Sequence, residues 1–347
     1  MLAAGGFGCV FRPRISCSGK PTKSSKEVTK VQADDQAARN EVSISQIVRT
    51  IPGYARYFGV VKSACPIQSS KITPLVTETC GVIKDVANLL LLTFDYVPNV
   101  SMHKVAMASL SRREDVYVLL HSYALLLESL VRLASVNILH MDLKAENVLY
   151  DAVYHLPVII DFGIATNMQK LTPAKWKVTF YVFAPEYYIW PPEINLIAYL
   201  LHVNDSPTEQ EISLMADAIM KNNKALDRLP TVFREKWATS FVAFCLPFLG
   251  RPSEEVIHEL TSFWKTWDNY SLSVMYVKFF SDWDAAHTAT HDFSMALLEP
   301  LLFSLHADPR MRYDAGTSLA KYQEAFRSDL SIGCVVSDLN SFRTKGQ

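Results

Sequence analysis

The sequence predicts an α+β protein in which a smaller strand-rich part precedes a larger helical part. Residues 1–33 are polar and interrupted by glycines, with short apolar pieces, and short apolar runs follow within 56–97, whereas a long helical pattern begins near Arg112. With 347 residues, the chain is long enough for two domains or for one large two-lobed domain. We therefore divide it into parts that span residues 1–97 and 98–347.

The periodicity of apolar residues and the turn residues between them place the elements in order along the chain. The predicted elements are strands and turns over 1–33, a helix over 34–50, strands within 56–97, a long helix with one apolar face from Val116 to Leu130, strands at 147–150 and 158–160, and helices beyond Pro192.

Composition excludes several classes of protein. Lys and Arg number 34, Asp and Glu number 35, and the formal net charge is −1, which argues against a basic nucleic-acid-binding surface. The longest uninterrupted apolar runs, near 89–94 and 241–249, fall short of the ~20 residues that span a bilayer. The first residues also lack a secretory signal pattern. We expect a soluble intracellular protein that binds neither nucleic acid nor membrane.

Cysteine and histidine spacing predicts no metal or disulfide framework. The six cysteines are scattered and form no CxxC motif, which favours a reducing compartment: Cys9, Cys17, Cys65, Cys80, Cys245 and Cys334. His287 and His291 have the spacing of a helical metal pair, but the glutamate of H-E-x-x-H and a third ligand are missing. We favour ordinary histidines over a zinc site.

Two strings separated by a short hairpin carry the chemistry. The first is HMDLKAEN at 140–147, and the second is DFG at 161–163. The hairpin brings Asn147 and Asp161 together, and their amide and carboxylate oxygens suit Mg²⁺. Gly5, Gly6 and Gly8 form a cluster that lets the backbone approach phosphate oxygens, although a plain hairpin turn is the alternative.

These strings resemble the eukaryotic-type Ser/Thr protein kinase family, and the resemblance runs nearly end to end. It implies a bilobal fold with an N-lobe at 1–97, whose first strand is largely missing, and a C-lobe at 98–347. It also implies ATP and Mg²⁺ as cofactors and a protein substrate with a Ser or Thr acceptor. GGFGCVFRP, HMDLKAEN and APEYYIWPPEI further resemble kinases of large nucleocytoplasmic DNA viruses, which implies the host cytoplasm or the virion.

The resemblance also implies a role for each site residue. Asp142 accepts the proton of the substrate hydroxyl, and Lys144 neutralises charge near the transferred group. Asn147 and Asp161 hold Mg²⁺. The nucleotide contacts are Gly5, Gly6, Gly8, Val10, Lys30, Glu41, and the backbone groups of Asp95 and Val97, with Phe94 as gatekeeper.

Some of these assignments have alternatives. Lys30 would hold the phosphates while paired with Glu41, but it also fits a solvated base in a Lys-rich stretch. Asp34 and Asp35 compete with Glu41 as its partner. The hinge at 91–98 also fits an ordinary strand end.

Downstream motifs complete the resemblance. It identifies Ala184-Pro185-Glu186 as the APE motif, Asp268 as the brace of the catalytic loop, and Arg312 as the ion-pair partner of Glu186. Thr179 lies five residues before Ala184, and the resemblance implies that a threonine at this position contacts Asp142 and Lys144. Met141 replaces the arginine of H-R-D, which predicts activity that needs no activation-loop phosphorylation.

A long segment without a catalytic motif, roughly 193–262, forms a helical insert. It is either a structural extension or the docking site of a partner. The alternative function is therefore a pseudokinase or scaffold that binds a partner through this insert, which the short first strand favours. A small-molecule kinase ranks third, because Lys144 and an APE motif are present.

Overall fold

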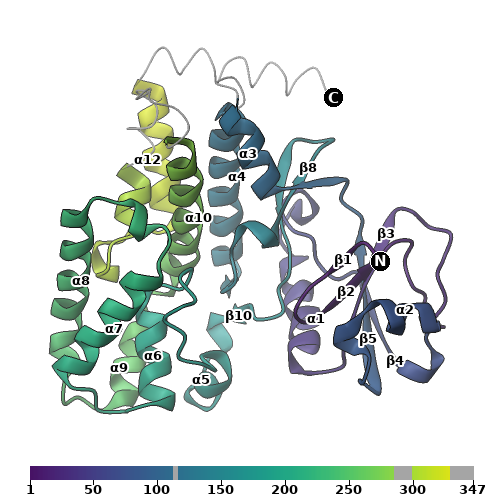
Figure 1. Ribbon diagram of the computed structural model, residues 1–347, viewed down its shortest axis with the longest axis horizontal. Coiled ribbons are helices and arrows are strands. Elements are labelled where there is room, and N and C mark those ends of the chain that lie inside the picture. Colours follow the sequence, from purple (N-terminus) through teal and green to yellow (C-terminus); the bar gives the residue numbers. More distant parts are fainter. Residues whose placement is uncertain (112–115, 285–298, 329–347) are drawn as a thin grey trace. The chain divides into compact units, whose positions relative to one another are not determined.

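The computed structural model describes residues 1–111, 116–284 and 299–328 (Figure 1). His287, His291 and Cys334 lie outside these residues. The chain divides into two compact units, one of residues 1–104 with 132–169 and one of residues 105–131 with 170–347. An N-terminal antiparallel sheet and a helical remainder confirm the predicted α+β kinase-like fold class.

A five-stranded antiparallel sheet forms the start of the first unit, in the order β1-β2-β3-β5-β4. Its strands are β1 (Ala3–Ala4), β2 (Gly8–Phe11), β3 (Glu27–Ala33), β4 (Ser63–Gln68) and β5 (Asn88–Asp95). β1 is two residues long. β3 lies inside the sheet, where Lys30 pairs with Val10 on one side and with Leu92 on the other.

Each face of the sheet is covered by a different segment, because side chains alternate between faces along a strand. Val31 and Leu91 pack with Val76 of α2 (Pro74–Thr79), in a segment where the sequence predicted only strands. On the other face, Leu92 packs with Ala38 of α1 (Gln36–Val48). The Asp35 side chain caps α1 by accepting from the Ala38 N–H.

Two disulfides fasten the first of these faces, which corrects the expectation of unpaired cysteines. Cys9 of β2 is bonded to Cys80, and Cys17 of the β2–β3 loop is bonded to Cys65 of β4. The partners are 71 and 48 residues apart in sequence, while their Cα atoms are 6.0 and 5.9 Å apart. Spacing could not reveal these pairs, because the sheet topology brings them together.

The first unit also contains two small sheets that carry the catalytic strings. β6 (Asn99–Ser101), β8 (Val148–Asp151) and β9 (Leu156–Ile159) form one, and β7 (Ile138–Leu139) and β10 (Thr166–Asn167) form the other. Gly59 donates to the Ile159 carbonyl at 2.9 Å. A Cβ at Gly59 would lie 2.9 Å from Ile160 Cγ2, so glycine permits the close approach to this strand.

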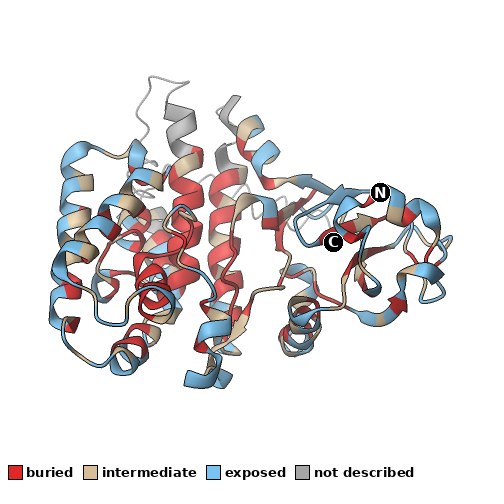
Figure 2. Cartoon of the chain, turned by 60° about the horizontal axis from the view of Figure 1, so that its bottom comes forward, coloured by how far each residue is buried: buried red, intermediate tan, exposed pale blue. Residues whose placement is uncertain are grey.

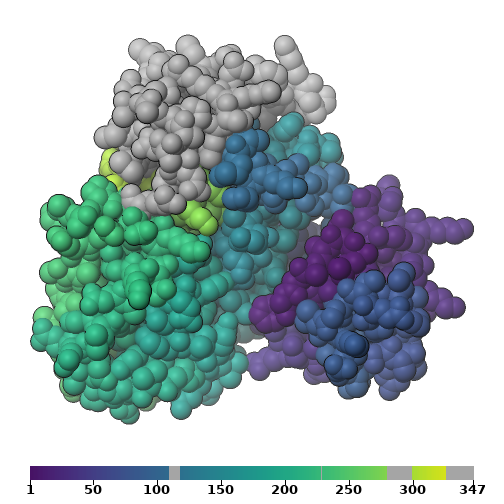
Figure 3. Space-filling model, in the orientation of Figure 1, coloured from purple at the N-terminus to yellow at the C-terminus, as the bar shows by residue number. Residues whose placement is uncertain are grey.

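The second unit is helical, as predicted. Its helices, with those that lead into it from α3 onward, include α3 (Met102–Ser111), α4 (Val116–Ser135), α5 (Pro173–Thr179), α6 (Pro192–His202), α7 (Glu209–Asn222), α8 (Thr231–Cys245), α9 (Ser253–Thr261), α10 (Trp267–Asp284) and α12 (Ala315–Ser328). Buried residues concentrate on the central helices, above all α10 (Figure 2). The predicted insert folds into α6–α9, which cover much of the face of this unit seen in Figure 3.

One apolar window escaped the sequence analysis because polar residues interrupt it. Among the described helices, only α4 contains a stretch that is long and apolar enough to cross a bilayer, the 18 residues Val118–Ser135. Of this window 56% is buried inside the structure, and buried core helices can be equally long and apolar. The window therefore identifies no membrane span by itself.

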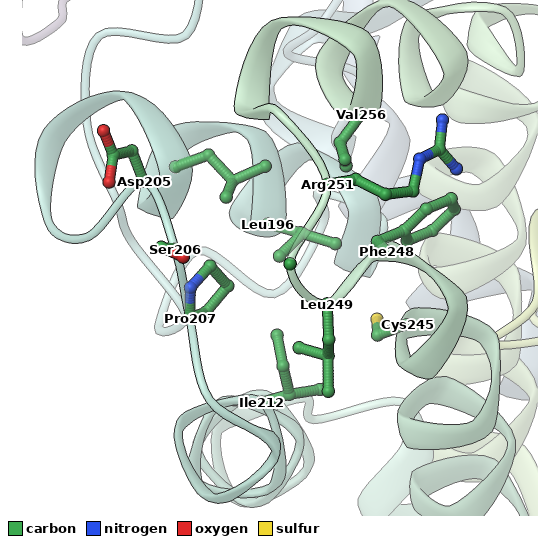
Figure 4. Close-up of a pocket in the computed structure, with 12 residues that line it drawn as sticks. Leu196, Asp205, Ser206, Pro207, Ile212, Cys245, Phe248, Leu249, Arg251 and Val256 are labelled. Atoms are coloured by element: carbon green, nitrogen blue, oxygen red, sulfur yellow. The ribbon is translucent and has the colours of Figure 1, made fainter.

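The insert helices enclose a small pocket beside Cys245 (Figure 4). Apolar side chains such as Leu196, Ile212 and Phe248 line it. Cys245 is the free cysteine within the described part of the chain, and burial raises the pKa of its thiol well above the usual value. This thiol is therefore a packing residue rather than a reactive one.

Candidate functional site

Lys30 connects three separate segments of the first unit. Its ammonium donates to Glu41 Oε2 at 2.9 Å and to Asp161 Oδ1 at 2.9 Å. The lysine comes from β3, Glu41 from the middle of α1, and Asp161 from the chain just after β9. The Glu41 side chain is 2% exposed and that of Asp161 is 32% exposed. One cation therefore serves two carboxylates, one enclosed and one open to solvent.

The pKa shifts in this cluster follow from burial and shared charge. Burial opposes the charge on Lys30, but Glu41 and Asp161 outweigh it and hold the pKa of Lys30 above its usual value. Burial likewise opposes the charge on Asp161, but the nearby ammonium prevails and lowers the pKa of Asp161. Burial raises the pKa of Glu41. Lys30 and Asp161 are consequently both charged at neutral pH.

Asn40 is a site residue that the sequence analysis did not select. Its side-chain Nδ2 donates to the carbonyls of Gly163, at 3.0 Å, and Ala165, at 2.8 Å. It thereby ties α1 to the segment that follows Asp161. Asparagine is a poor residue for a helix interior. Its place beside Glu41 is the signal that could have identified it.

Phe162 anchors the DFG segment in the interior of the first unit. Its ring is fully buried and meets His140 edge-on at 4.9 Å and Phe58 edge-on at 6.1 Å between ring centroids. Asp161 and Met141 have φ angles of 65° and 69°, a left-handed backbone that is uncommon outside glycine. Backbone strain of this kind clusters at functional sites.

The catalytic string places three polar side chains together. Asn147 Nδ2 donates to Asp142 Oδ2 at 2.8 Å and to the Asp142 carbonyl at 2.9 Å. The Lys144 ammonium lies 2.9 Å from Asp142 Oδ1. Because Asn147 Nδ2 donates to Asp142, the amide oxygen Oδ1 of Asn147 is the atom left to contact a ligand. Asp142 is thus oriented by two neighbours while it borders a pocket.

That pocket brings four of the predicted site residues, Lys30, Glu41, Asp142 and Asp161, to one place within the first unit. It holds about 320 Å³ of space not filled by atoms. Its lining residues are Phe7, Lys30, Gln32, Ala37, Glu41, Asp142, Asp161, Gly163 and Ile164. Three acids, a lysine and Phe7 at the tip of the glycine turn therefore surround one cavity.

The other predicted nucleotide contacts lie outside this lining. Gly5 and Gly6 are exposed in the turn between β1 and β2, where Gly5 N–H donates to the Gly8 carbonyl at 2.9 Å. Val10 is in β2, opposite Lys30. The two hinge residues follow at the end of β5. Asp95 pairs with Lys62 at 2.7 Å, and the Val97 carbonyl accepts from Asn99 at 2.8 Å.

The donor groups fit Mg²⁺ held together with phosphates. Asn147 and Asp161 offer hard oxygen atoms, which Mg²⁺ prefers, and the cation usually takes only one or two protein carboxylates besides phosphate and water. Within the described ranges, no group of three or more His, Cys, Asp or Glu side chains could hold a metal ion. A metal bound here would therefore share its coordination with a nucleotide.

The predicted pairing of Arg312 with Glu186 is wrong. Arg312 forms a two-pronged contact with Glu193, with Nη1–Oε1 at 2.7 Å and Nη2–Oε2 at 3.0 Å, and both side chains are fully buried. Glu186 is exposed. The motif is therefore Pro191-Pro192-Glu193 at the start of α6, where proline in the first helical turn is favourable.

A comparison with known families fits this arrangement. Residues 1–194, more than half of the chain, match the sequence model of the protein kinase domain. No curated protein matches the chain. The matched region contains the five-stranded sheet, the Lys30 cluster and the catalytic string, and it extends just past Glu193. This chain belongs to the protein kinase family.

Proposed function

We propose that this protein is an ATP- and Mg²⁺-dependent kinase that transfers the γ-phosphoryl group to Ser or Thr hydroxyls of a protein substrate. The observation that carries the proposal is the position of Lys30, within 2.9 Å of both Glu41 and Asp161. A lysine held in this way on β3 is what a kinase needs to hold the nucleotide phosphates.

Each residue around the pocket has a part in the proposed reaction. Asp142 accepts the hydroxyl proton, and its hydrogen bond from Asn147 fixes the carboxylate. Lys144 stabilises negative charge beside it. Asn147 and Asp161 would hold Mg²⁺, which neutralises charge on the phosphates when bound. Positioning and charge neutralisation account for most of the expected rate.

The choice of Ser and Thr over Tyr rests on Lys144, the residue that resembles the Ser/Thr members of the family. Its 2.9 Å contact with Asp142 supports this assignment. Thr179, at the end of α5, contributes no support. Its expected role was counted from Ala184, and that reference point is lost now that Glu193 pairs with Arg312.

A transfer assay tests the proposal directly. Incorporation of labelled phosphate from ATP into a mixture of basic proteins should fall by about 10²- to 10⁴-fold in Asp142→Asn. Glu146→Gln is the matched control, because Glu146 is an exposed acid of the same loop. Phosphoamino-acid analysis of the product should give phosphoserine or phosphothreonine. Equal incorporation by wild type and Asp142→Asn would exclude the kinase and favour a pseudokinase.

A further inference from the structure

Gln32 carries a buried polar atom that the fold leaves unsatisfied. The residue is 4% exposed, and its Oε1 has no hydrogen-bond partner among the described residues. Buried polar side-chain atoms nearly always have a partner, so each exception calls for an explanation. Packing within the sheet does not explain the unpartnered oxygen, because the structure shows Gln32 in no hydrophobic cluster and in no ion pair.

Gln32 lies in the candidate site itself. It follows Lys30 by two residues on β3, so both side chains project from the same face of the sheet. Gln32 lines the same pocket as Lys30, Asp142 and Asp161. A Cβ on the paired Gly8 would lie only 2.8 Å from Gln32 Cβ, so β2 closes tightly over this position.

We propose that Gln32 Oε1 binds the hydrated Mg²⁺ of the metal–nucleotide complex, an inference that rests on the proposed kinase function. An amide oxygen accepts hydrogen bonds and ligates hard cations, but it cannot donate. Phosphate oxygens ionised at neutral pH offer it no donor. The waters that Mg²⁺ retains do offer one, and the cation itself accepts an amide oxygen directly. Gln32 thus adds an oxygen to those of Asn147 and Asp161.

In this role, the unpartnered oxygen of Gln32 lowers the stability of the ligand-free protein and increases its affinity for the metal–nucleotide complex. Replacing an unpartnered buried polar group by an apolar group of similar shape is neutral or stabilising. Gln32→Leu should therefore unfold at the same temperature as wild type or at a higher one. The same change should weaken binding of the metal–nucleotide complex. A purely structural glutamine would not produce this combination.

Calorimetric titration with ADP, in the presence of Mg²⁺ and separately with a chelator, tests the inference without measuring catalysis. Gln32→Leu should bind ADP about tenfold more weakly with Mg²⁺, as expected for loss of an outer metal contact, and as tightly as wild type with the chelator. Gln32→Glu should retain the effect of Mg²⁺, because an oxygen is kept. Gln68→Leu, at an exposed position of β4, is the matched control and should behave as wild type.

The outcomes separate this inference from the function on which it rests. If Mg²⁺ increases the affinity for ADP equally in Gln32→Leu and in wild type, the inference is wrong while the kinase proposal stands. If Gln32→Leu loses affinity equally with Mg²⁺ and with the chelator, Gln32 serves the nucleotide and not the metal, and the inference is again wrong. If wild type binds no ADP under either condition, both proposals fail.

Discussion

The two units of the molecule each contain an ionic cluster, and the clusters are built differently. In the first unit, one ammonium, Lys30, serves two carboxylates, and the Asp161 side chain is 32% exposed. In the second unit, Arg312 meets the single carboxylate of Glu193, and both side chains are 0% exposed. Arg312 also donates to the His306 carbonyl at 3.0 Å.

The difference distinguishes a cluster that can bind a ligand from one that only stabilises the fold. The Glu193–Arg312 cluster is neutral and closed, so it offers nothing to a ligand. The Lys30 cluster has two carboxyl groups for one ammonium, and one of them is open to solvent with the unsatisfied oxygen of Gln32 beside it. Incomplete satisfaction of this kind is expected where binding energy is reserved for a ligand, and a complete pair is expected where the interaction only stabilises the fold.

The two units also use cysteine differently. In the first unit, Cys9–Cys80 cross-links β2 to the end of α2, and Cys17–Cys65 cross-links the β2–β3 loop to β4. In the second unit, Cys245 is a free thiol among packed helices. A small unit buries less of its surface than a large one and gains more from cross-links. We infer that the first unit is the more dependent on covalent bonds.

The largest expected effect is the loss of the closed ion pair. Glu193→Gln leaves the buried Arg312 charge without compensation and should lower the free energy of unfolding by about 3–5 kcal/mol. Glu186→Gln changes an exposed residue and should stay within about 0.5 kcal/mol of wild type. Urea unfolding followed by circular dichroism measures both. Equal stability of the two variants would restore Glu186 as a possible partner of Arg312.

The second largest effect is the loss of a disulfide. Cys9→Ala combined with Cys80→Ala should cost about 2–4 kcal/mol, because the bond no longer restricts the unfolded chain. Thermal unfolding measures the change. Alkylation of the denatured, unreduced protein should leave Cys9, Cys17, Cys65 and Cys80 unmodified.

The double substitution also tests the contrast between the units. Cys245→Ala removes a single buried thiol and no cross-link, so it should cost less. If all four cysteines of the first unit are alkylated without reduction, the disulfides are absent from the protein in solution.

Sequence reasoning found the parts of the site that sit in short, contiguous strings. Asp142, Asn147 and Asp161 were found because their spacing along the chain is itself the signal. Partners that depend on tertiary structure were missed. Glu193 was overlooked because two Pro-Glu motifs lie within ten residues of each other, and only the fold shows which one meets Arg312.

The same reasoning could not find the contacts that cross the sheet. The disulfide partners are separated by whole strands, and their spacing resembles no known motif. Asn40 and Gln32 matter through one polar atom each. Asparagine inside a helix marks Asn40 as unusual, but the pattern does not show which groups it contacts. Periodicity sorts apolar from polar positions, but it does not tell which polar atom has a partner.

The third prediction concerns the tie between α1 and the DFG segment. Asn40→Ala leaves the Gly163 and Ala165 carbonyls without their donor and should cost about 1–2 kcal/mol. It should also speed hydrogen exchange in the segment after Asp161, because that segment loses its contact with α1. Gln36→Ala, at the exposed start of the same helix, is the control and should leave the exchange unchanged. Faster exchange in both variants would mean that α1 as a whole has loosened.

The smallest expected effect is at the start of α7, in the second unit, where the charge is exposed. Glu211 accepts from the Thr208 backbone N–H at 2.8 Å, from Asn204 and from Tyr199, and these bonds lower the pKa of Glu211 to about 2. An acid with a lowered pKa in the folded state contributes stability above its unfolded value of 4.5. That contribution is lost as the pH falls from 4.5 toward about 2.

Glu211→Gln should therefore be less stable than wild type at neutral pH, and the two proteins should converge as the pH approaches 2. Thermal unfolding across this range measures the difference. Glu209→Gln, two residues earlier on the same helix and exposed, is the control, since it lies outside the capping box that joins Thr208 and Glu211. A constant difference between Glu211→Gln and wild type at every pH would show that the bonds matter and the charge does not, which would set this site apart from both ionic clusters.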